Sequence, residues 1–525
     1  MKNILRTLIL FLIFLLIYSC APKKKITKPL IIGVIGDMDT TNDFITQNAF
    51  SSEVINQIYL HLFKENTDFQ EHPPTFSPEI VEKYEFEDDY TLNCKIREDL
   101  FWSNGQKLTV KDIIFTHKSA TSKEVAWIGI ETKKYIKEII PIDDYNFQVT
   151  FTKKTPYMLM DLNEGVIYPE NEFGKIPYKD WRNFDFSKIR VFSGPYILKD
   201  WRKQEAIYLE KNPYFYKKGY PLIENVVFRI VPDQNSLLTQ FLSYAVDMME
   251  LIPPKDVEKV KKDPNLELVT YPDRQYVYIG WNLKNPLFKN RNVRRALSMS
   301  INIQEIIDVV WHGLARQSIG PVHSSLWAFN KNLNPISFDL EKAKEILKRE
   351  GKVDKNGDGI LEINGKPFEF ELITNKGNAI REQTAVLIQN HLSKLGVKVN
   401  LNFLEWNKMI KSLMSKTFDA CLQGWRVATK VDFKEIWHSS SIDGGYNIVS
   451  YSNSEVDKLI EEMENLLDYN ESKKYIDKIQ EIIYEDQPYT FLYENMKING
   501  INKKVKGYDM NEFSAFYNLY QWKID

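Results

Sequence analysis

The side chains that could carry catalysis are spread along this chain without forming a known catalytic pattern. None of its seven histidines pairs with another four residues away beside a glutamate, as a zinc hydrolase requires. The acids in Asp88–Asp89 and Asp143–Asp144 are adjacent, a spacing that usually marks turns rather than a separated acid and base. No Gly-x-Ser-x-Gly motif occurs. A hydrolase therefore stays only as an alternative, and we predict that the chain is not an enzyme.

One segment begins like a calcium-binding loop. Residues 354–359 read Asp-Lys-Asn-Gly-Asp-Gly, but the twelfth position, where such a loop needs a bidentate glutamate, is Gly365. We therefore expect a turn between a helix and a strand rather than an ion site. The sequence predicts no metal and no cofactor.

The first residues predict chemistry of another kind, the attachment of lipid to Cys20. Lys2 and Arg6 supply positive charge around a short apolar run, and a lysine-rich stretch follows the cysteine. This pattern is typical of a secretory signal. The Ile-Tyr-Ser-Cys ending resembles a bacterial lipobox, which implies a signal peptide at residues 1–19, acyl chains on Cys20 and a tether at 20–29. An uncleaved signal-anchor helix is the alternative; in either case the rest of the chain works outside the cytoplasm, held at a membrane.

The composition beyond Cys20 is that of a large globular protein. About 505 residues follow it, too many for one core, so two or three domains are expected. The whole chain has a formal net charge of −2 and no basic stripe, which argues against a nucleic-acid partner. Only Cys94 and Cys421 remain, so stability must come from a large core, and the sequence does not tell whether they pair.

Strand and helix patterns alternate along the chain, which favours α/β domains with mixed sheets. Thr109 followed by Asp112 is an acidic form of the capping box and predicts the start of a helix. Apolar or alternating runs predict strands at residues 30–35, 145–151, 226–231, 368–373 and 397–403. Apolar residues at helical spacing predict helices at 53–63, 291–310, 339–349, 379–395 and 455–467.

A series of short motifs resembles one family over nearly the whole mature chain. Residues 101–115, with Trp102 and Gly105, are similar to the early signature of the family 5 solute-binding proteins, which serve ABC importers of peptides, nickel and related solutes. The later blocks follow in the family's order, at residues 194–198, 209–216, 226–233, 293–297, 354–359, 424–425, 437–440, 445–447 and 451–457. Each motif is weak alone, but their shared order and spacing make the resemblance specific.

The resemblance implies a fold of two lobes that close over a ligand, of the type II, cluster C-like kind, with an extra subdomain. We expect lobe I at residues 30–55, 190–275 and 490–525, the extra subdomain of lobe I at 56–189, and lobe II at 276–489. The chain should cross between the lobes near residues 273–280 and 488–493. Arg294 and Arg295 are expected to be solvated or to make contacts between the lobes.

The function implied by the resemblance is capture of a small solute, with a peptide as the family-based expectation, and delivery to an ABC permease in the membrane. The chain is expected to act as a lipid-anchored monomer in the periplasm or on the outer face of the cytoplasmic membrane. A surface lipoprotein that binds a protein partner, as a chaperone, adhesin or sensor, is the alternative.

The resemblance also implies where ligand is bound. Trp425 follows Gly424 at the end of a predicted strand and matches a tryptophan that lines the family's cleft. The family's later loops place His438, Tyr446 and Asn447 near the cleft. For His438 a structural hydrogen bond is the simpler interpretation.

The loop after Trp425 departs from the pattern of the peptide binders. Their acid that pairs the ligand's α-amine is replaced by Ala428 or Lys430, depending on alignment, and Asp432 is the only carboxylate nearby. Arg426 and Lys430 could instead favour an anionic ligand group, or could be solvated loop charges. We include Arg426, Lys430 and Asp432 among the candidate ligand-binding residues.

Overall fold

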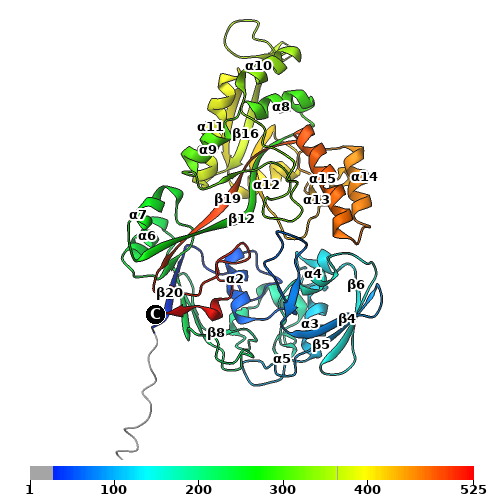
Figure 1. Cartoon of the computed structure of the whole chain (residues 1–525), viewed down its shortest axis with the longest axis vertical. Coiled ribbons are helices and arrows are strands. Elements are labelled where there is room, and N and C mark those ends of the chain that lie inside the picture. The colour runs from blue at the N-terminus through cyan, green and yellow to red at the C-terminus, as the bar shows by residue number, and fades with distance from the viewer. Residues whose placement is uncertain (1–27, 364) are drawn as a thin grey trace, which may run out of the picture.

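Two lobes stacked along the long axis of the molecule are joined by two long strands (Figure 1). The structure is a computed structural model and describes residues 28–363 and 365–525. The expected signal peptide, Cys20 and most of the expected tether therefore lie outside the described residues. Strands β12 (Leu266–Trp281) and β19 (Tyr489–Asn502) run side by side between lobe I, the lower lobe, and lobe II, the upper one. Within the two described ranges, no helix is long and apolar enough to span a membrane.

One mixed sheet runs through both lobes. Its strand order is β17–β16–β18–β12–β19–β11–β1–β10–β9–β8, and β13 also pairs with β19. Parallel and antiparallel pairs both occur, so the predicted α/β architecture with mixed sheets is confirmed. The strands of this sheet are β1 (Leu30–Val34), β8 (Tyr196–Arg202), β9 (Ala206–Lys211), β10 (Asn225–Ile230), β11 (Met248–Met249), β12, β13 (Arg316–Gln317), β16 (Glu369–Asn375), β17 (Lys398–Leu404), β18 (Ala420–Arg426) and β19.

The two crossing strands lose their regular pairing on the way from one lobe to the other. The register shifts between Pro272, opposite Met496, and Tyr276, opposite Glu494. Such a bulge bends a strand and re-aims its side chains. The crossing predicted near residues 273–280 overlaps this break, and the one predicted at 488–493 lies at the lobe II end of β19.

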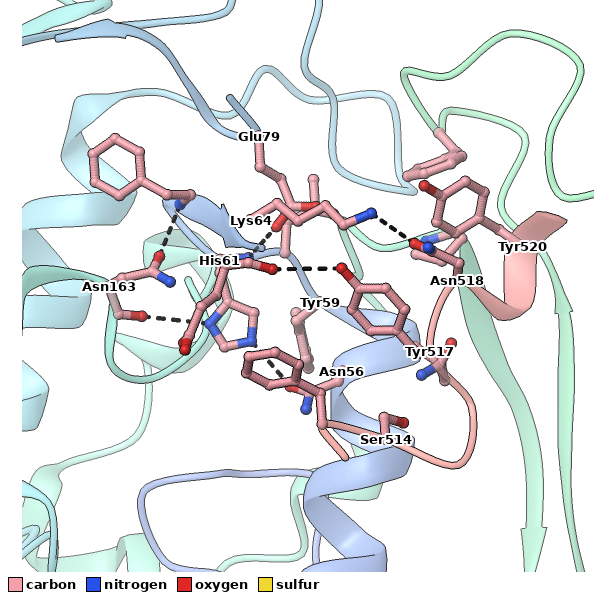
Figure 2. A pocket seen from close by; sticks show the side chains of 17 residues that line it. Asn56, Tyr59, His61, Lys64, Glu79, Asn163, Ser514, Tyr517, Asn518 and Tyr520 are labelled. Carbon is pink, nitrogen blue, oxygen red and sulfur yellow. Dashed lines mark hydrogen bonds between the residues drawn. The ribbon is translucent and has the colours of Figure 1, made fainter. Parts of the chain in front are cut away.

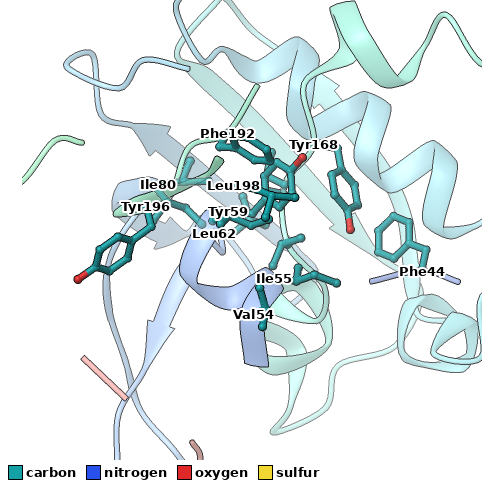
Figure 3. Close-up of a cluster of buried hydrophobic side chains, with 14 of the residues drawn as sticks. Phe44, Val54, Ile55, Tyr59, Leu62, Ile80, Tyr168, Phe192, Tyr196 and Leu198 are labelled. Carbon is teal, nitrogen blue, oxygen red and sulfur yellow. The ribbon is translucent and has the colours of Figure 1, made fainter. Parts of the chain in front are cut away.

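Lobe I and the expected extra subdomain share one hydrophobic core. In Figure 3, Tyr59 lies among side chains that include Tyr168 and Phe192, and its ring meets that of Tyr168 edge-on at 5.1 Å. The predicted boundaries at residues 55–56 and 189–190 remain predictions, and the core runs across them. The elements here are α2 (Ala49–Ile58), β2 (Phe63–Glu65), β3 (Phe76–Pro78), β4 (Val81–Phe86), β5 (Thr91–Ile96), α3 (Val110–Ala120), β6 (Ile136–Pro141), β7 (Asn146–Phe151), α4 (Met158–Asn163) and α5 (Glu170–Phe173), followed in lobe I by α6 (Gln234–Leu242), α7 (Val257–Lys261), β20 (Val505–Lys506) and β21 (Lys523–Ile524).

Lobe II buries both faces of its part of the sheet. The neighbouring residues Leu372 and Ile373 of β16 belong to two different apolar clusters, because successive side chains of a strand point to opposite faces. One cluster packs against α8, α9 and α11, and the other against α12, α14 and α15. The elements are α8 (Arg291–Met299), α9 (Ile303–Val310), α10 (Leu340–Arg349), β14 (Glu362–Ile363), β15 (Lys366–Pro367), α11 (Ala379–Lys394), α12 (Trp406–Met414), α13 (Lys434–Trp437), α14 (Ser454–Met463) and α15 (Tyr469–Asp486).

Several local predictions are confirmed. The backbone N–H of Thr109 donates to Asp112 Oδ2 at 2.9 Å, as a capping box requires. The expected turn forms because the Asp354 carboxylate accepts hydrogen bonds from the backbone N–H groups of Gly357 at 2.7 Å and Gly359 at 2.9 Å. The sequence left open whether Cys94 and Cys421 pair, and in the structure both are buried and unpaired.

Other local predictions are wrong. The single helix expected at residues 291–310 is two helices, α8 and α9, because the Asn302 side chain accepts from the Glu305 N–H and starts a new helix. The 18-residue helix α15 was not predicted, although Ile476, Ile479 and Ile483 follow helical spacing and are buried.

Arg294 is buried, which corrects the expectation of a solvated or interlobe side chain. Its guanidinium donates hydrogen bonds to the backbone carbonyls of Phe288, Lys289, Asp486 and Gln487. These carbonyls come from the turn before α8 and from the end of α15, so Arg294 ties these two segments of lobe II together. Arg295 is the surface residue of the pair and contacts Glu485 at 2.8 Å.

Arg294→Met is expected to lower the free energy of unfolding by about 3–5 kcal/mol, because buried carbonyls would lose their donors. Arg295→Met is the matched control and should cost about 0–1 kcal/mol, as expected for a surface ion pair. Urea unfolding of both variants measures the difference. Equal losses in the two variants would contradict the inference that Arg294 ties these two segments of lobe II together.

Candidate functional site

Strand β19 has one apolar face and one polar face. Met496 and Ile498 line an apolar cavity on the other side of β19, so Asn495, Lys497 and Asn499 must point the opposite way. Asn499 Nδ2 donates to the hydroxyl of Tyr271, the β12 residue opposite Lys497, at 2.9 Å. Polar side chains of both strands thus meet on this face of the pair.

Trp425 lies at the outer end of an aromatic stack. Its ring is parallel to that of Tyr278 at 6.5 Å, and Tyr278 in turn stacks on Tyr489 at 3.8 Å. Tyr446, which is 52% exposed, meets the Trp425 ring edge-on at 5.9 Å. The inner rings are buried, whereas Trp425 keeps a partly exposed face beside Tyr446.

Gly424 allows this arrangement because its neighbours approach its backbone closely. A Cβ at this position would lie 2.9 Å from Gln275 Nε2 and 3.0 Å from the carbonyl oxygen of Tyr276. The Gly-Trp pair therefore seats β18 tightly against β12 and presents the indole at the edge.

Both basic residues of the Trp425 loop are paired within the chain. Arg426 Nη1 lies 3.3 Å from Asp273 Oδ1, and Lys430 Nζ lies 2.8 Å from Asp161 Oδ1. Asp161 belongs to α4 in the extra subdomain, so the second ion pair spans the two lobes. Burial raises the pKa of Asp161 above its ordinary value, and the nearby charge of Lys430 offsets only part of this rise. The cations that suggested an anionic ligand group thus already have partners.

The remaining predicted residues separate into two groups. Asp432 Oδ1 accepts from the backbone N–H of Lys434 at 2.8 Å, beside a small cavity that Lys430 also lines. Asn447 is fully buried, and its amide binds the carbonyls of His438 at 3.1 Å and Tyr451 at 2.8 Å. His438 is also buried, with Nδ1 3.0 Å from the N–H of Ser440. The bonds of Asn447 and His438 hold a lobe II loop, whereas Trp425 and Tyr446 contact each other and are both accessible to solvent.

A charged cluster that the sequence analysis missed lies beside the Trp425 loop. The Arg274 guanidinium sits over the rings of Phe69 at 5.6 Å and Phe513 at 5.3 Å. Burial lowers the pKa of Arg274, and the nearby acids Glu65 and Glu512 offset only part of this effect. Arg274 stands in the bulge of β12, and the alternation of apolar and polar residues gives no signal where a register shifts.

Lobe I adds carboxylates from segments far apart in sequence. Glu53 accepts a hydrogen bond from Ser514, and burial raises its pKa against the opposing charges of Lys497 and Arg426. The pKa of Glu250 is raised to about 7, chiefly by burial. The charge of Lys497 opposes this rise, and the charge of Glu53 adds to it. Charged groups of both signs, from both lobes, thus lie near the crossing strands.

Comparison with known proteins assigns the chain to a family. The profile of the family described as bacterial extracellular solute-binding proteins, family 5 Middle, matches residues 75–447. The chain belongs to this family. The oligopeptide-binding protein AppA of Bacillus subtilis is 31% identical over 516 residues, which cover 96% of this chain and 94% of AppA.

Solved structures of this family share the fold. The structure of AppA from B. subtilis in complex with a nonapeptide has a TM-score of 0.78 at 30% identity and covers 95% of this chain and 99% of AppA. NikZ from Campylobacter jejuni in complex with Ni(L-His) has a TM-score of 0.79 at 22% identity, covering 94% and 99%. The second likeness shows the fold alone.

The family assignment confirms three predictions. The fold is the two-lobed fold of periplasmic solute-binding proteins, and the relatives are binding proteins rather than enzymes. The predicted solute-binding protein is thus confirmed, and the hydrolase alternative is no longer needed. The family is extracellular, which agrees with the predicted place of action outside the cytoplasm.

Lys430→Met is expected to weaken closure of the lobes by about 1–3 kcal/mol, because the buried Asp161 carboxylate would lose its counter-charge. Without ligand, the variant should show a larger radius of gyration in X-ray scattering than the unchanged chain. Lys434→Met is the matched control, because Lys434 pairs at 3.1 Å with Glu464 inside lobe II. If Lys430→Met scatters as the unchanged chain does, the ion pair does not hold the lobes together.

Proposed function

We propose that this chain is a lipid-anchored monomer that captures a peptide between its two lobes and delivers it to an ABC permease. The observation that carries the choice of peptide is the 31% identity to an oligopeptide-binding protein across 96% of the chain. The mixed charges of the cleft support the same choice, because a peptide has an ammonium group and a carboxylate to pair with them. A ligand that contacts both lobes favours the closed arrangement by its differential affinity.

Native mass spectrometry of the chain from residue 21, purified without refolding, tests the proposed function. A peptide should be carried through the purification, and the loaded chain should be more compact in X-ray scattering than the chain stripped of ligand. A chain that carries and binds no peptide would contradict the proposal and favour a lipoprotein with a protein partner.

Trp425→Ala is expected to weaken binding of the peptide identified in this way by about 1–3 kcal/mol, or roughly ten- to a hundredfold. The loss follows because Trp425 has a partly exposed ring face between the lobes. Trp406→Ala on α12 is the control, since Trp406 is 51% exposed and stands away from the Trp425 stack. Calorimetry measures both; native affinity in a folded Trp425→Ala variant would make this residue part of the core only.

Cys20→Ala is expected to abolish lipid attachment, so that the chain is released from membranes or accumulates as an unprocessed precursor. The physical reason is that several acyl chains, at about 0.8 kcal/mol per buried CH₂, supply the anchor. Membrane fractionation and the mass of the processed chain provide the measurement. Unchanged processing and membrane retention would contradict the lipoprotein proposal.

A further inference from the structure

A cavity of about 270 Å³ lies inside lobe I, between the carboxyl end of α2, strand β2 and the segment of residues 513–520 (Figure 2). Aromatic side chains form much of its lining, among them Phe63, Phe215, Tyr517 and Tyr520. Pockets that enclose a whole small-molecule ligand usually measure about 300–1,000 Å³. This cavity is below that range, so it suits one side chain of a larger solute.

The rim of the cavity reaches the contact between the lobes. Glu65 lines the cavity, and its Oε1 accepts a hydrogen bond at 2.9 Å from Thr429 of lobe II, four residues after Trp425. Phe513 also lines the cavity, and its ring lies under the guanidinium of Arg274. The lining of the cavity therefore touches the lobe II loop that follows Trp425.

Most polar groups of the lining are already bonded to each other. Lys64 Nζ donates to Asn518 Oδ1 at 2.7 Å and lies 4.9 Å from the centre of the Tyr517 ring. His61 Nε2 is 3.0 Å from Asn56 Oδ1, and its Nδ1 is 3.1 Å from the carbonyl of Gly165. Figure 2 shows the Lys64–Asn518 and His61–Asn56 bonds.

Glu79 is the exception among the lining residues. Its carboxylate accepts a hydrogen bond from the backbone N–H of His61 at 3.2 Å, and the described residues provide it with no other hydrogen bond and no ion pair within 4 Å. A carboxylate offers about four acceptor sites, so most of its capacity is unused. Burial raises the pKa of Glu79, and the nearby charges of His61, Lys217 and Lys64 offset this only in part.

We propose that this cavity binds one cationic side chain of the solute, of the arginine or lysine type, with its charged head on Glu79. The rings of Tyr517, Tyr520 and Phe215 surround the stem, and aromatic rings attract cations as well as apolar groups. Lys64 does not compete for Glu79, because its ammonium is held by Asn518. This inference rests on the proposed function, since it requires a peptide in the cleft, and it adds a specificity for one basic residue.

The experiment compares pairs of peptides. The two members of a pair have arginine or neutral citrulline at one position and are otherwise identical, and each position is tested in turn. At one position, arginine should bind the unchanged chain at least tenfold more tightly than citrulline in calorimetry. In Glu79→Gln, which keeps the shape and removes the charge, this ratio should fall to about one. Glu138→Gln is the matched control, because Glu138 is an exposed residue of β6 in the same subdomain, and it should keep the full ratio.

The outcomes separate this inference from the proposed function. Peptides that bind, but with no preference for arginine at any position, would overturn the cavity's role and leave the proposed function standing. A preference that survives in Glu79→Gln would also overturn it. If none of the peptides binds, both proposals fail. Should Glu79→Gln not fold, Glu79→Asp serves instead. Its side chain is one methylene shorter, so the carboxylate lies farther from the ligand, and the ratio of arginine to citrulline affinity should fall at least threefold.

Discussion

The pairing of β12 with β19 is the constraint on which the rest of the structure depends. Lobe I joins this pair through β11, and lobe II joins it through β18, so the main-chain bonds of two strands connect both halves. The pairing shifts register between Pro272 and Tyr276. At this place the sheet is least regular, and Asp273 and Arg274 stand there, between the lobes. The same irregularity that bends the connection therefore brings charged groups to the cleft.

The charges between the lobes largely satisfy one another. Lys430 reaches Asp161 in the extra subdomain, and Thr429 reaches Glu65 in lobe I. Because a buried charge without a partner is costly, these contacts favour the closed arrangement even before a solute adds its own. A solute then shifts an equilibrium that the chain's own contacts already bias toward closure.

Much of the fold could be predicted from the sequence, whereas much of the site could not. Short apolar runs located β1 and β10, and helical spacing located α11. The Gly424–Trp425 pair was singled out by resemblance to the family, and Trp425 contacts Tyr446. Patterns failed where long-range contacts decide the structure. Nothing local distinguishes the buried Arg294 from the partly exposed Arg295, and no spacing brings Glu79 close to Asn518, more than 400 residues later. Charge pairing across the cleft is likewise invisible, because Lys430 and Asp161 meet only in the folded chain.

The core of lobe I is built from both ends of the chain. Leu30 and Ile32 near its start share a cluster with Phe516 and Trp522 near its end. Such contacts are among the most distant in sequence that the chain offers, and contacts of this kind form slowly. During synthesis, lobe I cannot complete its core until residues 516–522 have emerged. A nascent chain of this topology stays incompletely folded throughout translation, and export machinery that threads unfolded polypeptides can accept a chain in that condition.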